Sequence, residues 1–237
     1  MRPGLLLATA AAIVVAAAGE AGAQGASSAD ARLRQALDAP TYQAVSLVFD
    51  SARARGIPVR PLVNRALQAT LHRTPGPRVH EAVVKLAGRL DVAKGALGPG
   101  SSEAELSAGA NALAIGVPRA TLVEIRALSP RQPVTVPLGV LTELVAREVT
   151  INRASQMVVA LLRNGVTPAQ LLSLSDDVSH DVNAGIEPGA AVDIRTRGAL
   201  GTLQQGLGDN GLDTDARLKA PASAPGAGAA TKVPRKP

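Results

Sequence analysis

Gly116-Val117-Pro118-Arg119-Ala120-Thr121-Leu122 is the stretch that decides the fold, because its pattern recurs along the chain. A glycine just past a helix end takes the left-handed conformation, the next apolar residue packs back on the last turn, and proline or threonine begins another helix. The pattern returns at Gly56-Ile57-Pro58 and Gly165-Val166-Thr167, where Leu62 and Leu171 again lie six residues after the glycine. It predicts a helix, a tight corner and a second helix.

Two further corners are less regular. Glutamate replaces glycine at Glu148-Val149-Thr150, and Gly185-Ile186-Glu187-Pro188 is a degenerate form of the pattern. The corners at 148, 165 and 185 lie 17 and 20 residues apart, which is the length of one short helix and one corner. The sequence therefore predicts an all-α fold of about ten short helices, arranged as an irregular solenoid-like repeat or as a compact bundle.

The segments between the corners carry apolar residues at the spacing of half-buried helices. Ser102 with Glu105 and Thr167 with Gln170 have the spacing of capping boxes at helix starts. Residues 130–137 contain three prolines and predict an extended linker. We expect helices at about 29–37, 41–55, 59–73, 78–94, 102–115, 118–128, 137–147, 150–164, 167–184 and 189–205.

The first 23 residues have the layout of an export signal, with Arg2, an apolar run from Leu5 to Ala18, and Ala21-Gly22-Ala23 as a cleavage site. We predict cleavage after Ala23 and a periplasmic or secreted bacterial protein without a transmembrane segment. The alternative is an uncleaved membrane anchor, although the apolar run is shorter than the roughly 20 residues that a spanning helix needs.

Residues 24–206 are predicted to form one helical domain, and residues 207–237 a polar loop followed by a disordered, basic, Pro/Ala-rich tail. Cysteine is absent, and Tyr42 and Phe49 are the only aromatic residues. The core must therefore be aliphatic, and aromatic platforms for single-stranded nucleic acid are excluded. Of the formal charge of +6, four positive charges lie in residues 219–237, so we expect no nucleic-acid partner for the helical body.

Two acidic patterns have the residue types of a metal site. Asp177 and Asp181 share one face of a predicted helix, with His180 beside them. Asp209-x-Gly211-x-Asp213-x-Asp215 alternates oxygen donors but lacks the bidentate glutamate of a calcium loop. We interpret the first pattern as a solvated helix end and the second as a surface loop, because no ligands converge from other elements. No metal and no cofactor is expected.

A run of arginines surrounds the first corner. Six arginines and no acid lie between Asp50 and Glu81, which predicts a basic face able to meet the phosphate or carboxylate polymers of a bacterial envelope. The alternative is an ordinary solvated helix surface. The arginines are Arg53, Arg55, Arg60, Arg65, Arg73 and Arg78.

No catalytic motif occurs: the chain lacks a G-x-S-x-G elbow, a phosphate loop and a dinucleotide fingerprint. The corners, joined to an export signal and a basic tail, resemble those of uncharacterised exported bacterial all-helical proteins over residues 44–192, which implies a fold and no activity. We therefore predict a non-enzymatic envelope module that binds another protein through helix faces or a groove. The alternatives are an electrostatic module that holds anionic polymer through the arginine face or the tail, and a hydrolase with a dispersed site.

Overall fold

The computed structural model describes residues 29 and 31–209 and confirms the all-α fold. Within these residues a helical stretch at 31–36 is followed by nine α-helices, and no strand is present. The predicted signal at 1–23 and nearly all of the predicted loop and tail lie outside the described residues. The helices are α2 (Ala39–Ala54), α3 (Arg60–Leu71), α4 (Gly76–Leu97), α5 (Glu103–Ala114), α6 (Arg119–Leu128), α7 (Thr135–Ala146), α8 (Ile151–Arg163), α9 (Pro168–Asn183) and α10 (Pro188–Asp209).

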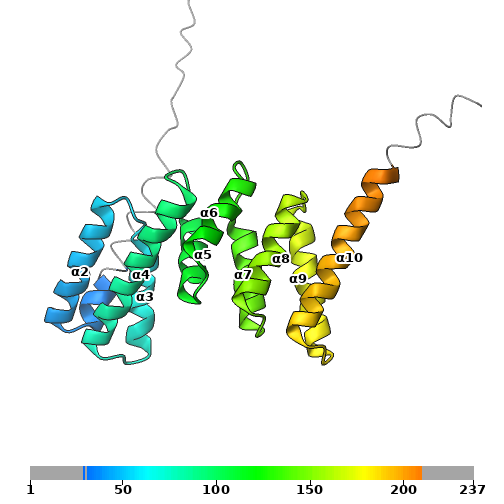
Figure 1. Ribbon diagram of the computed structural model, residues 1–237. Coiled ribbons are helices and arrows are strands. Elements are labelled where there is room, and N and C mark those ends of the chain that lie inside the picture. The colour runs from blue at the N-terminus through cyan, green and yellow to red at the C-terminus, as the bar shows by residue number, and fades with distance from the viewer. Residues whose placement is uncertain (1–28, 30, 210–237) are drawn as a thin grey trace, which may run out of the picture.

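The helices follow one another in a row along the molecule (Figure 1). Every extensive contact joins helices that are one or two places apart in chain order, such as α4 with α5, α5 with α7, and α8 with α10. This nearest-neighbour pattern is that of a solenoid rather than a closed bundle. None of the helices within 29 and 31–209 combines the length and the apolar character needed to cross a membrane.

The five predicted corners all have the left-handed backbone. The φ angles are 64° at Gly56, 95° at Gly116, 75° at Gly165, 93° at Gly185 and 67° at Glu148. At each corner the next residue donates its N–H to the carbonyl oxygen five residues earlier, at 2.9–3.1 Å. This hydrogen bond is the one that closes a Schellman motif, so each corner satisfies a carbonyl that the helix end leaves free.

A residue at a fixed distance after each corner lies in the core. The residue six positions after the corner residue is fully buried at all five corners, whether it is leucine or alanine. These residues are Leu62, Leu122, Ala154, Leu171 and Ala191. The repeat therefore conserves a geometric position along the solenoid more strictly than it conserves a residue type.

A sixth corner lies at Arg73, which the sequence pattern missed. Arg73 has a φ of 52°, and the N–H of Thr74 donates to the carbonyl oxygen of Ala69 at 3.0 Å. Val79, six residues further on, is fully buried like its counterparts. The corner has neither a glycine nor an apolar follower. Gly76 belongs to the first turn of α4, so this helix starts two residues before the predicted position 78.

Several helix boundaries differ by two or more residues from the prediction, and three of them illustrate the reasons. Helix α4 continues through Gly95 to Leu97, because Ala96 and Leu97 are buried and this burial outweighs the low helix propensity of glycine. Helix α7 begins at Thr135 instead of Pro137, since a proline in the first turn costs no hydrogen bond. Helix α10 continues to Asp209, so the first residues of the predicted polar loop are helical.

Glu105 ties the connection between α6 and α7 to the start of α5. Its side chain forms the predicted capping box with Ser102, accepts the N–H of Val134 at 3.0 Å, and pairs with the guanidinium of Arg126. Burial alone would raise the pKa of Glu105, but the hydrogen bonds from Ser102, Val134 and Arg126 outweigh burial and lower this pKa to about 2. The carboxylate of Glu105 therefore holds this irregular connection in place through its hydrogen bonds and its ion pair.

Candidate binding groove

The structure divides the six arginines of the predicted basic face. Three of them are neutralised by carboxylates at or beyond the ends of the arginine stretch, so the six do not form one uniform basic surface. The pairs are Arg53–Asp50 at 2.6 Å, Arg55–Asp91 at 3.1 Å and Arg60–Glu103 at 2.6 Å. A fourth arginine, Arg73, forms the corner between α3 and α4.

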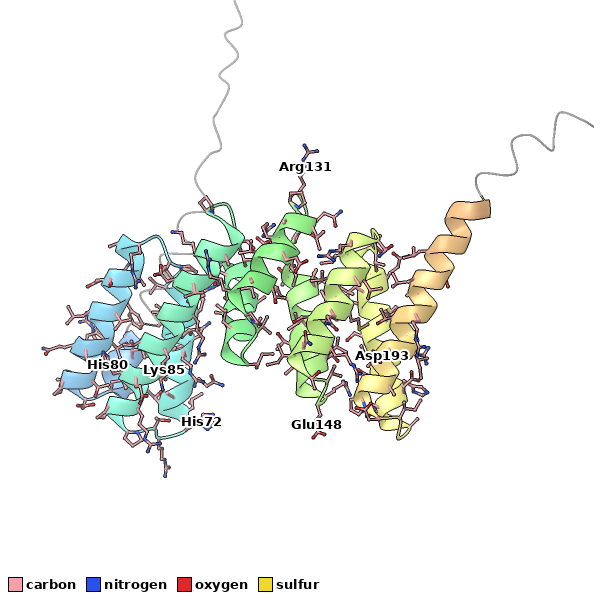
Figure 2. All side chains as sticks on the ribbon, in the orientation of Figure 1. His72, His80, Lys85, Arg131, Glu148 and Asp193 are labelled. Atoms are coloured by element: carbon pink, nitrogen blue, oxygen red, sulfur yellow. The ribbon has the colours of Figure 1, made fainter. Side chains whose placement is uncertain are left out.

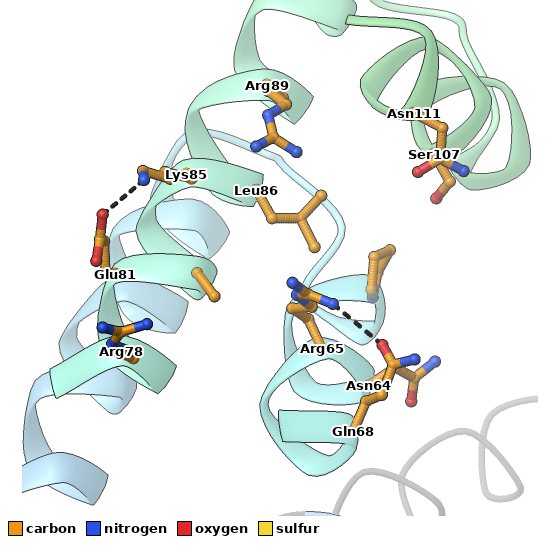
Figure 3. A pocket seen from close by; sticks show the side chains of 12 residues that line it. Asn64, Arg65, Gln68, Arg78, Glu81, Lys85, Leu86, Arg89, Ser107 and Asn111 are labelled. Carbon is orange, nitrogen blue, oxygen red and sulfur yellow. Dashed lines mark hydrogen bonds and ion pairs between the residues drawn. The ribbon is translucent and has the colours of Figure 1, made fainter. Parts of the chain in front are cut away.

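The remaining two arginines, Arg65 and Arg78, line an open groove of about 820 Å³ between α3, α4 and α5. Figure 3 shows Arg65 of α3 and Leu86 and Arg89 of α4 pointing into the space between these helices. Lys85 of α4 also belongs to the lining. The groove thus joins part of the predicted face to two basic residues that lay outside the predicted set.

The tight packing of α5 on α4 builds one side of the groove. A Cβ atom placed on Gly109 of α5 would lie 3.1 Å from the Cβ of Ala93 and 3.1 Å from Cδ1 of Leu97, both on α4. A side chain at position 109 would therefore push α4 and α5 apart by a few tenths of an ångström. Ser107 and Asn111 flank Gly109 along α5 and line the groove opposite α3.

The positive charge of the groove is only partly compensated. Four cations line it against one carboxylate, Glu81, which pairs with Lys85 at 2.5 Å. The hydrogen bond and charge of Lys85, assisted by the charge of Arg78, lower the pKa of Glu81, so this carboxylate is ionised. Arg89 has no hydrogen bond or ion pair with any side chain or carbonyl that the structure describes, and Arg65 donates only to the amide oxygen of Gln68 at 3.3 Å.

The walls carry uncharged polar groups that sequence reasoning did not single out. Asn64 and Gln68 lie one helical turn apart on α3, and Ser107 and Asn111 lie one turn apart on α5. The side chains of Asn64, Ser107 and Asn111 make no hydrogen bond to another residue within the described part of the chain. Their spacing of four residues was visible in the sequence, but the facing of the two helices was not.

The acidic residues of the possible metal site at Asp177, His180 and Asp181 bind an arginine side chain. Both carboxylate oxygens of Asp181 accept hydrogen bonds from Arg195 of α10 at 2.6 Å, and Asp177 lies 3.5 Å from the same guanidinium. These bonds hold the pKa of Asp181 below its usual range. His180 is exposed, and residues 29 and 31–209 contain no cluster of three or more such side chains able to hold a metal ion. The acidic pattern beginning at Asp209 lies almost wholly outside the described residues.

The other surface features are less specific. An apolar hollow of about 460 Å³ lies between α2 and α4, where Leu47 is 71% exposed and His80 lines the wall. His72 and Arg131 project at opposite ends of the helices (Figure 2). Neither histidine lies beside a carboxylate in a way that marks a general acid or base.

The groove between α3, α4 and α5 is therefore the strongest candidate site. Its guanidinium and ammonium groups can form charge-assisted hydrogen bonds to carboxylate or phosphate oxygens. Its one hydroxyl, on Ser107, has no histidine or carboxylate as a hydrogen-bond partner among the described residues. Comparison of the chain with protein-family models, curated proteins and solved structures found no match.

Proposed function

We propose that this protein is a non-enzymatic helical binding module that holds an anionic partner in the groove between α3, α4 and α5. The observation that carries the proposal is the excess of cations over carboxylates in the lining of that groove, four against one. The proposal retains the export inferred from residues 1–23, so the partner would be a protein or polymer of the bacterial envelope or its surroundings.

A comparison with the other arginines supports the groove. Elsewhere in the described chain the same residue type is used to join neighbouring helices through carboxylates. Examples are Arg60 with Glu103, Arg126 with Glu105, Arg153 with Asp193, Arg163 with Glu124 and Arg195 with Asp181. Arg65, Arg78 and Arg89 make no ion pair with a carboxylate of a neighbouring helix. A bound anion would relieve the mutual repulsion of these cations.

The basic tail is the competing electrostatic element. Residues 219–237 carry four positive charges and no acid, so they too would attract a polyanion. The groove differs in that its cations lie on two packed helices, α3 and α4. A pre-ordered site loses less entropy on binding than a segment that is predicted from its sequence to be disordered.

The proposal is tested by measuring the affinity of the full chain for fluorescein-labelled poly-L-glutamate. The variant Arg65→Glu/Arg89→Glu is compared with Arg131→Glu/Arg197→Glu, which has the same net charge but is altered outside the groove. We expect the groove variant to bind at least about tenfold more weakly, because reversing two charges removes about 1–2 kcal/mol of attraction. The control should stay within about twofold of wild type, since separated surface charges are screened by salt.

A third variant separates the groove from the tail. In it Lys219, Lys232, Arg235 and Lys236 are all replaced by glutamine. Equal losses in the groove variant and its charge-matched control, or loss only in the tail variant, would contradict the proposal.

A further inference from the structure

We infer that the groove between α3, α4 and α5 takes an extended acidic polypeptide segment of about five residues. The inference rests on the proposed function and goes beyond it by naming the chemistry of the partner. A phosphate or sulfate polymer would satisfy the cations equally well, so the choice depends on the uncharged groups of the walls.

The walls offer hydrogen-bond acceptors as well as donors. Each amide side chain has one oxygen that accepts and one NH₂ group that donates. Asn64 and Gln68 supply such groups from α3, and Asn111 supplies one from α5. A polyanion made only of phosphate oxygens has no donor for the amide oxygens. A peptide backbone has both an N–H and a C=O at every residue.

The amides face the space beside the cations and, apart from one contact, are unused within the described residues. The oxygen of Gln68 accepts a hydrogen bond from Arg65 at 3.3 Å, while Asn64 and Asn111 have no side-chain hydrogen bond. Asparagine has a low helix propensity, so two of them in helix interiors with no internal partner cost stability. Hydrogen bonds to a bound peptide backbone would offset this loss of helix stability.

The length of the segment follows from helix α4. The cations that α4 contributes to the groove begin at Arg78 and end at Arg89. These two residues are eleven positions apart, and eleven residues of helix span about 16 Å. An extended chain covers about 3.3 Å per residue, so about five residues match this length. Alternate side chains of an extended segment point to the same side, so acidic residues two positions apart would all face α4.

The test compares three probes on the full chain: the labelled peptide Glu-Gly-Glu-Gly-Glu, the same peptide with N-methylated backbone amides, and a polyphosphate of similar charge. The variant Asn64→Ala/Gln68→Ala removes the α3 amides without changing any charge. The matched control, Asn152→Ala/Gln156→Ala, removes exposed amides at the same spacing on α8. Alanine is the better helix former, so loss of folding is not expected in either variant.

We expect the α3 variant to bind the unmethylated peptide about tenfold more weakly and to bind polyphosphate as wild type does, because two neutral hydrogen bonds are lost only with the peptide. N-methylation should weaken peptide binding to wild type by a similar factor. An unchanged affinity of the α3 variant for the peptide, while Arg65→Glu/Arg89→Glu weakens both probes, would overturn the peptide inference and leave the anionic groove standing. If Arg65→Glu/Arg89→Glu weakens neither probe, the proposed function fails as well.

Discussion

The corner at Gly165 allows the backbone strain of the repeat to be measured without interference from packing. Gly165 has a φ of 75°, and a Cβ atom added to it would have no other atom within 4 Å. Gly165→Ala therefore probes the left-handed backbone alone. That conformation costs an L-residue roughly 1–2 kcal/mol, and the lower chain entropy of unfolded alanine offsets about 0.5 kcal/mol of this.

We expect Gly165→Ala to lower the free energy of unfolding by about 1 kcal/mol and the Tm by about 3 °C. The matched control is Gly139→Ala. Gly139 is exposed within α7, and its added Cβ atom would also meet nothing within 4 Å, but its φ is not positive. At this position alanine should raise the free energy of unfolding by about 0.5–1 kcal/mol.

Thermal and urea unfolding followed by circular dichroism would measure both variants against wild type. The two substitutions are chemically identical, so the opposite signs isolate the effect of the backbone angle. If Gly165→Ala equals or exceeds wild type in Tm while Gly139→Ala behaves as expected, the corner geometry is wrong. The left-handed geometry assigned to the other five corners would then also be refuted.

Three further predictions concern stability. Glu148→Gly should raise the free energy of unfolding by about 0.5–1 kcal/mol in calorimetry, because the strain at its φ of 67° exceeds the added chain entropy of glycine; a decrease would show that Glu148 makes a compensating contact. Gly76→Ala should lower the free energy of unfolding by about 1–3 kcal/mol in urea denaturation, because its Cβ atom would lie 2.0 Å from Oγ1 of Thr41. Adding Thr41→Ala should restore part of this stability, and additive losses in the double variant would contradict the contact. Glu105→Gln should lower the free energy of unfolding by about 3 kcal/mol at neutral pH. The difference from wild type should disappear as the pH falls from about 4.5 toward 2, because a carboxylate with a depressed pKa loses its stabilising effect over that range. A difference that does not change with pH would refute the role of ionised Glu105.

The corners could be predicted because their physics is local. A glycine and one apolar follower are enough to specify the left-handed residue and the returning hydrogen bond. Glu148 was recognised from its register with Val149 and Thr150, although glutamate itself disfavours the conformation. The corner at Arg73 was missed because neither Arg73 nor Thr74 carries the local signal.

The groove could not be predicted, because it depends on contacts between distant segments. Arg60 and Glu103 are 43 residues apart, so no local pattern indicates that this arginine is neutralised. Arg89 follows Glu81 in the chain and so fell outside the acid-free stretch, yet packing turns it toward α3 and α5. Solenoid folding places helices one or two positions apart side by side, and binding sites arise from that placement.

The most direct test of the binding groove is an NMR titration of the full, isotope-labelled chain with the peptide Glu-Gly-Glu-Gly-Glu. If the groove between α3, α4 and α5 holds the peptide, amide shifts should concentrate at residues 60–71, 76–97 and 103–114 and should diminish as salt is raised. Shifts confined to residues 219–237, or spread evenly over the helical body, would contradict the assignment of the groove as the binding site.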